Sequence, residues 1–230
     1  MDGFRRYAVY YTAPPGVLAR FGAGWLGWDS AAGQVVDHPQ VPGLDPARVA
    51  ALTDVPRRYG FHATLKPPFV LAGGSARALA DDLAVLAAGL APVELPGGLQ
   101  LAELDGFIAL IPSRQPAALT DLAAALVGGL DGHRAPLTPA DRARRRPEQL
   151  NERQRELLDL WGYPFVMEEF RFHMTLTGPV TRAEGAEVAA ILRSVMESIL
   201  PRPHVIDAVT LSGEDDLGRF HDILRVPLGG

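Results

Sequence analysis

The chain alternates between two periodicities of apolar residues. Leucines recur every three or four positions at 79–90 and again at 119–130, which is the spacing of one buried helix face. Ser75 precedes the first of these stretches as an N-cap candidate. Alternating apolar residues at 99–104 and 107–111 flank Asp105-Gly106, which is a strong signal for a β-hairpin. The pattern therefore predicts two amphipathic helices and a hairpin between them.

The remaining segments extend this picture. We expect further strands at 5–12, 59–66, 170–177, 205–211 and 219–226, and further helices at 17–28, 45–53, 138–146, 148–161 and 181–200. Because several strands are linked as hairpins, the order of elements favours an α+β fold on antiparallel sheets. The order also repeats, as two similar halves without a Gly/Ser linker, so we predict that residues 1–230 form a single bilobal domain.

Composition narrows the functional classes. The 230 residues are 47% hydrophobic but contain no apolar run of the roughly 20 residues that a membrane span needs, and no signal-peptide core. We therefore expect a cytoplasmic protein without a membrane partner. The absence of cysteine excludes disulfides and thiolate chemistry. A net charge of −5 argues against binding to an extended nucleic acid, but not against a small anionic substrate held by local cations.

One motif occurs twice. Residues 61–65 and 172–176 both read Phe-His-x-Thr-Leu, with their histidines 111 positions apart. In a strand, alternate side chains point to opposite faces, so His62 and Thr64 share one face and His173 and Thr175 share another. The apolar members of each copy face the core. A structural duplication without chemistry is the plain alternative, and two copies with matching neighbours make it the weaker one.

The same alternation extends both polar faces. It adds Lys66 to the first, and Arg171 and Thr177 to the second. In the opening strand, Tyr7 and Tyr11 lie on the face opposite Tyr10, and alternation does not decide which face is inward; we include Tyr10 among the substrate-binding candidates. Tyr59 has the parity of Phe61 and is assigned to the core.

If the two polar faces meet, two imidazoles, two hydroxyls and two cations converge, which suits a phosphate group. One imidazole can act as a general base while the other, protonated, donates to the leaving oxygen. Hydroxyls and cations stabilise the charge on the phosphate oxygens. Neither motif has a carboxylate or second histidine on its polar face, so we expect no metal and no cofactor. A metal site remains an alternative, with His204, or His221 beside Asp222, as the available recruits.

The arginine cluster at positions 142, 144, 145 and 146 is more typical of a solvated helix face than of a ligand-binding patch. We therefore assign it no function from the sequence.

The two motifs resemble those of the 2H phosphoesterase superfamily, which includes the LigT-like RNA cyclic phosphodiesterases. The segments at 6–11, 59–69 and 170–179 look most like the branch encoded beside bacterial phosphonate-utilisation genes. The resemblance implies a bilobal α+β fold of two antiparallel-sheet lobes, with pseudo-twofold symmetry, helices packed outside and the motifs in a central groove. It also implies metal-independent phosphodiester hydrolysis, with His62 and His173 as the acid–base pair and Thr64 and Thr175 holding the phosphate.

We therefore expect a phosphodiesterase that hydrolyses a small cyclic phosphate, of ribose type or a nucleotide, in phosphonate metabolism. The sequence does not determine the oligomeric state, and we favour a monomer. Two alternatives stay open. One is a non-catalytic module that binds phosphorylated ligands, and the other is a 2′,3′-cyclic phosphodiesterase acting on RNA ends, which the negative charge disfavours for a long RNA. The sequence does not distinguish the acid from the base.

Overall fold

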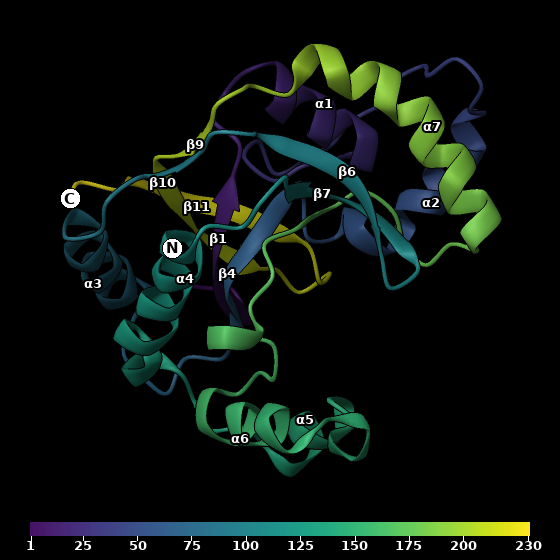
Figure 1. The fold of residues 1–230 in the computed structure, drawn as a ribbon. Helices are drawn as coiled ribbons and strands as arrows, with labels where there is room; N and C mark the ends of the chain where they lie inside the picture. The colour runs from purple at the N-terminus through teal and green to yellow at the C-terminus, as the bar shows by residue number, and fades with distance from the viewer.

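A seven-stranded antiparallel sheet forms the centre of the computed structural model, which describes residues 1–230 (Figure 1). Its strands, in spatial order, are β11 (Phe220–Pro227), β10 (Ala208–Glu214), β1 (Arg6–Thr12), β4 (His62–Phe69), β8 (Met174–Thr175), β7 (Phe107–Pro112) and β6 (Leu99–Leu104). Two small pairs join β2 (Trp28–Asp29) to β3 (Gln34–Val35), and β5 (Val93–Leu95) to β9 (His204–Ile206). The predicted α+β class is confirmed.

The two motif strands lie side by side at the centre of the sheet. The strand groups on either side of them are not the successive halves of the chain that the sequence predicted, because β10 and β11 from the C-terminal end pair beside β1, and β6 and β7 lie beside β8. β4 belongs to the first half and β8 to the second, and they pair antiparallel with Ala63 opposite Met174. The two predicted sheet lobes are therefore joined edge to edge into one continuous sheet. An antiparallel pair has a local twofold axis between its strands, and here that axis passes between the central residues of the two motifs.

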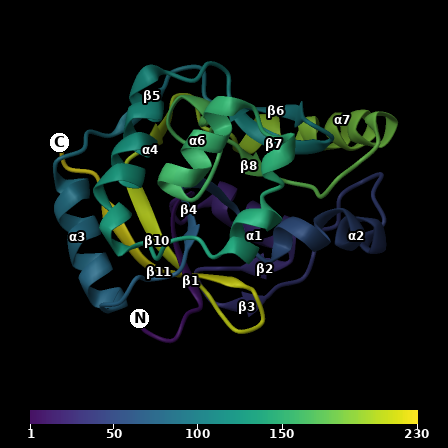
Figure 2. The same ribbon diagram turned by 90° about the horizontal axis from the view of Figure 1, so that it is seen from below.

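Helices cover one face of this sheet and its ends. They are α1 (Val17–Leu26), α2 (Pro46–Arg57), α3 (Ala76–Ala88), α4 (Ala117–Gly129), α5 (Pro139–Arg144), α6 (Glu152–Trp161) and α7 (Arg182–Ile199). α3 packs on β10 and β11, α4 on β4, and α7 on β6 and β7. Figures 1 and 2 show α3 and α4 at one side of the molecule and α2 and α7 at the other, and Figure 1 shows α5 and α6 below both groups.

Local sequence explains most of these boundaries. The Ser75 side chain accepts a hydrogen bond from the Ala78 N–H and caps α3, as predicted. Asp105 and Gly106 both have positive φ, at 45° and 86°, as the tight turn between β6 and β7 requires. The predicted strand at 170–177 is regular only at Met174–Thr175. The Gln115 side chain there binds the Phe172 N–H and the Phe170 carbonyl, in place of a neighbouring strand.

The main hydrophobic core lies between the sheet and these helices. In β1, Tyr7, Val9 and Tyr11 belong to this core, whereas Ala8 and Tyr10 lie on the opposite face against Phe220. Strand alternation did not decide which face of β1 is inward. In the structure, Tyr7 and Tyr11 face the main core and Tyr10 faces away from it. No helix in the structure is both long and apolar enough to cross a bilayer.

Candidate functional site

The two motifs occupy neighbouring strands with their polar residues on one face. Their apolar residues, Phe61, Ala63 and Leu65 in one copy and Phe172, Met174 and Leu176 in the other, all belong to the main core. Because Ala63 is opposite Met174, the antiparallel register places His62 opposite Thr175 and Thr64 opposite His173. All four of these side chains are partly exposed. The structure thus brings together the four residues that the motifs single out.

Each histidine ring is fixed by a backbone carbonyl two residues earlier. His62 Nδ1 lies 2.9 Å from the Gly60 oxygen, and His173 Nδ1 lies 2.7 Å from the Arg171 oxygen. A carbonyl oxygen only accepts, so both Nδ1 atoms carry a proton and Nε2 is the atom available for chemistry. Gly60 takes this position with φ at 73°, a left-handed conformation that glycine adopts without strain.

The His62 ring is more enclosed than the His173 ring. Its ring centroid is 3.9 Å from that of Tyr10 and 6.1 Å from that of Tyr59. Burial is the main reason that the pKa of His62 is lowered to about 4; the hydrogen bond to Gly60 partly opposes this effect, and the charge of His173 adds to it. The ring is therefore neutral near pH 7. Its Nε2 lies 3.1 Å from the Thr64 hydroxyl, which donates to it in this neutral form.

A cavity of about 260 Å³ adjoins His62. Thr175 from the second motif and Thr177, just after it, line this cavity, and the β6–β7 turn at Asp105–Phe107 closes one side. The Thr177 hydroxyl accepts a hydrogen bond from the Ile108 N–H at 3.0 Å and is buried. Thr177 therefore holds β7 against the second motif, and its predicted contact with substrate stays a prediction. The His173 ring packs beside Phe107, with their centroids 5.9 Å apart.

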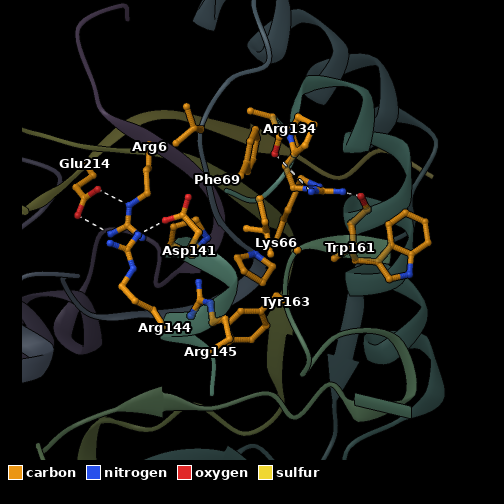
Figure 3. A pocket seen from close by; sticks show the side chains of 18 of the residues that line it. Arg6, Lys66, Phe69, Arg134, Asp141, Arg144, Arg145, Trp161, Tyr163 and Glu214 are labelled. Atoms are coloured by element: carbon orange, nitrogen blue, oxygen red, sulfur yellow. Dashed lines mark hydrogen bonds and ion pairs between the residues drawn. The ribbon is translucent and has the colours of Figure 1, made fainter. Parts of the chain in front are cut away.

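Lys66 does not lie where strand alternation predicts. In the pairing with β1, Thr64 is opposite Tyr10 but Lys66 is opposite Val9, so β4 contains one extra residue at this point. Such a β-bulge reverses the alternation and places Lys66 on the face of Val9 rather than that of His62. The lysine is buried and lines a second cavity, of about 590 Å³, which Figure 3 shows.

Two other positions depend on the backbone around the motifs. Arg171 is exposed and lines neither of these cavities; its carbonyl, rather than its guanidinium, reaches the His173 ring. Tyr59 was assigned to the core by alternation, and this is wrong. The positive φ of Gly60 turns the chain, so Tyr59 lines the cavity beside His62 and stacks on Phe220. The only sequence signal for this position is that an aromatic residue, Tyr59, directly precedes a glycine, Gly60.

Tyr10 has one further property of a site residue. It is 1% exposed, and its hydroxyl has no hydrogen-bond partner among the protein groups. Burial raises the pKa of this phenol, so it stays protonated and can donate a hydrogen bond.

The alternative metal ligands are engaged elsewhere. His204 Nε2 lies 2.8 Å from the Tyr11 hydroxyl on the core side of the sheet, and His221 Nε2 lies 2.8 Å from an Asp215 oxygen. No three His, Asp or Glu side chains come together in a group that could hold a metal ion.

Comparison with known proteins gives one family model, described as "Protein of unknown function (DUF1045)", which matches residues 64–221. Two relatives carry the name "Ribose 1,5-bisphosphate phosphokinase PhnN". The one from Janthinobacterium sp. (strain Marseille) is 34% identical over 236 residues, which cover 100% of this chain and 52% of the relative. The one from Laribacter hongkongensis (strain HLHK9) is 34% identical over 226 residues, covering 96% and 51%. The chain thus spans about half the length of these curated relatives.

Similar solved structures include LigT from E. coli. Its apo form has 16% sequence identity and a TM-score of 0.48, with 100% of both chains covered. Its complex with 3′-AMP has 14% identity and a TM-score of 0.44, with 99% of both chains covered.

Proposed function

Since the chain belongs to the DUF1045 family, whose description assigns no activity, we propose from the geometry of its site that it is a metal-independent phosphodiesterase acting on a small cyclic phosphate. The observation that carries this proposal is the pairing of Ala63 with Met174, which places two His-x-Thr motifs around one local twofold axis. We also propose that residues 1–230 act as one domain, because both motif strands pair in the same sheet.

The two histidines divide the acid–base work. His62, whose pKa is about 4, is neutral and accepts a proton at Nε2 from the attacking water. The water oxygen forms a bond to phosphorus as the bond from phosphorus to the leaving oxygen breaks. His173, protonated at both nitrogens, donates its Nε2 proton to that leaving oxygen. The products are a phosphate monoester and a free hydroxyl, and the two rings exchange protons with solvent before the next turnover.

The threonines hold the phosphate in this scheme. Thr64 and Thr175 lie opposite the two histidines across the β4–β8 pair, where their hydroxyls can donate to the non-bridging oxygens. Thr64 donates to His62 in the structure, so a bound phosphate competes with the imidazole for this hydroxyl. The Tyr10 hydroxyl is a third buried donor beside His62.

The dimensions and charge favour a small substrate. The cavity at His62 holds about 260 Å³, and the net charge of −5 opposes a long RNA. The curated relatives are named for a kinase of ribose 1,5-bisphosphate, so a ribose that carries a cyclic phosphate is the substrate we propose first. A role in phosphonate metabolism stays a prediction from the family resemblance.

The test is hydrolysis of a panel of cyclic phosphates in excess chelator. The panel contains 2′,3′-cyclic nucleotides, a trinucleotide with a 2′,3′-cyclic end and ribose 1,2-cyclic phosphate. We expect chelator-resistant turnover that falls by roughly 10²–10⁴-fold in His62→Gln and in His173→Gln. His133→Gln is the matched control, because His133 pairs with Asp82 away from the motifs.

The outcomes separate the alternatives. Turnover that survives both substitutions within tenfold contradicts the two-histidine mechanism. Binding of panel members without turnover would favour the non-catalytic module. Turnover confined to the trinucleotide would favour the RNA-end enzyme.

A further inference from the structure

A second cavity is lined by cations from distant parts of the chain. Its volume is about 590 Å³, and Figure 3 shows its side chains converging from several elements. Arg6 comes from β1, Lys66 from β4, Arg134 from the segment after α4, and Arg144 and Arg145 from the end of α5. We call this the arginine cavity. Arg144 and Arg145 from the 142–146 cluster both line this space. The Arg144 side chain is still largely exposed, in agreement with the predicted solvated face, whereas Arg145 is half-buried.

The charges in the arginine cavity do not balance. Its walls carry six cations, with Arg5 the sixth, and the carboxylates within reach of them are Glu214, Asp141 and Asp131. This excess of positive charge lies in a chain whose net charge is −5. Ion pairs alone therefore do not explain the cluster, because there are twice as many cations as carboxylates to pair with them.

Three of the arginines are already paired. Arg6 binds both carboxylate oxygens of Glu214, one of them at 2.6 Å from Nη2, and Arg144 binds Asp141. Arg134 binds Asp131 through two nitrogens, at 2.8 and 3.1 Å. These pairs hold the guanidinium groups in place around the cavity.

Of the three remaining cations, Arg5 is exposed, whereas Lys66 is buried and Arg145 half-buried, and both of these have donors to spare. Lys66 is 2% exposed and donates to the Val127 carbonyl at 2.9 Å, while the nearest carboxylate oxygen, from Asp131, is 3.7 Å away. An ammonium has three donors, so two are left without a hydrogen-bonding partner in the protein. Arg145 makes no ion pair, and its guanidinium lies over the Tyr163 ring at 4.7 Å from the centroid.

A buried ammonium with unused donors is costly unless an anion completes it. Burial is the main reason that the pKa of Lys66 is lowered to about 8; Asp131 partly opposes this effect, and the neighbouring Arg134 charge adds to it. A bound anion would offset the Arg134 charge and raise the pKa of Lys66. Arginine forks match the oxygens of a phosphate, and a phosphate monoester carries close to two negative charges at neutral pH.

The arginine cavity lies at the end of β1 and β4 beyond the histidine site, where Arg6 reaches it from the Tyr10 face of the sheet and Lys66 from the Val9 face. Arg6 lies four residues from Tyr10 on the same face of β1, about 13 Å along the strand, and Tyr10 contacts the His62 ring. The Arg6 charge lowers the pKa of Tyr10, against the larger effect of burial. Tyr59 lines the His62 cavity and raises the pKa of Tyr163, which lines the arginine cavity, although burial is the larger cause.

We propose that the arginine cavity binds a phosphate monoester carried by the same substrate whose cyclic phosphodiester is positioned at His62 and His173. This rests on the proposed function and deepens it, because it makes the substrate a doubly phosphorylated sugar or nucleoside. Lys66 and Arg145 are the specificity-determining residues, and the paired arginines complete the anion site.

The first experiment compares matched ligands that differ by one phosphate. These are adenosine 2′,3′-cyclic phosphate and ribose 1,2-cyclic phosphate, each with and without a 5′- or 5-phosphate. The wild type should have a kcat/KM roughly 10- to 100-fold higher for the 5′- or 5-phosphorylated member of each pair. Arg145→Gln should reduce this ratio at least tenfold. Arg142→Gln should leave it unchanged, because Arg142 lies on the same helix but pairs with Asp159 outside the cavity.

The second experiment does not depend on turnover. Calorimetric titration of His62→Gln with the same ligands measures whether the extra phosphate tightens binding. We expect at least tenfold tighter binding of the 5′- or 5-phosphorylated ligands, lost when Arg145→Gln is added and retained with Arg142→Gln. This result would support the arginine cavity even if no member of the panel were hydrolysed, so failure of the proposed function is distinguishable.

Two results would overturn the proposal. One is that the protein binds the ligands with and without the 5′- or 5-phosphate equally tightly. This includes the case in which inorganic phosphate binds the cavity but the extra phosphate of the ligand does not tighten binding. The other is a phosphate preference that survives both Arg145→Gln and Lys66→Met, with circular dichroism showing that the variants are folded.

Discussion

Protonation of His62 should destabilise the folded protein, because the ring is packed against Tyr10 with its Nδ1 proton held by Gly60. Its pKa is about 4 in the fold, against an ordinary value of 6.5. Between these values the unfolded chain binds a proton that the folded chain does not, so stability rises with pH. This contribution is complete above about pH 6.5 and is lost as the pH falls toward 4.

The size of the effect follows from the difference in pKa. A shift of about 2.5 units corresponds to about 3 kcal/mol in the limit of low pH, as an upper bound for a ring that is partly exposed. Between pH 7 and pH 5.5 the same relation gives a loss of about 1 kcal/mol from His62 alone. Other groups also titrate in this range, so the contribution must be isolated by substitution.

The assay is urea unfolding of wild type and His62→Gln at pH 7 and pH 5.5. The wild type should lose about 1 kcal/mol more free energy of unfolding than the variant over this interval. A nuclear magnetic resonance titration of the His62 ring gives the pKa directly. Identical pH dependence in both proteins, or a ring that titrates near 6.5, would refute the argument and remove the reason for naming His62 the general base.

Two further substitutions test the packing around the motifs. Gly22→Ala should lower Tm, although alanine favours a helix over glycine by about 1 kcal/mol. The reason is that the new alanine Cβ would lie 2.7 Å from the Phe61 Cβ and clash with that side chain. Gly24→Ala on the same helix makes only ordinary contacts and should not lower Tm. Thr177→Val should cost about 1–3 kcal/mol in urea unfolding, because it leaves the Ile108 N–H unpaired, whereas Thr177→Ser should recover most of this; equal stability of Val and Ser variants would contradict the assignment.

Local patterns in the sequence were sufficient for much of this fold. Leucine spacing predicts α3 and α4, and the Asp105-Gly106 turn predicts the β6–β7 hairpin, because both depend on neighbours within a few residues. The faces of the two motifs follow from strand alternation for the same reason. The candidate histidines and threonines could therefore be named from the sequence, and their chemical roles stay proposals.

Alternation failed where the backbone leaves regular strand geometry. A bulge in β4 moves Lys66 to the other face, and the positive φ of Gly60 moves Tyr59 out of the core. The second motif strand is short because the Gln115 side chain takes over its hydrogen bonds. Each of these effects depends on a partner that is remote in the sequence or on a conformation that residue types alone do not specify.

The sequence by itself determined which residues are chemically suited to a phosphate and which face of each motif is polar, since both depend on residue type and a two-residue repeat. Only the tertiary structure decided that the motifs pair at Ala63 and Met174, and that Arg6, Lys66, Arg134 and Arg145 meet in one cavity. The physical reason is that strand register and cavity walls are set by contacts between segments far apart in the chain, which no local periodicity encodes.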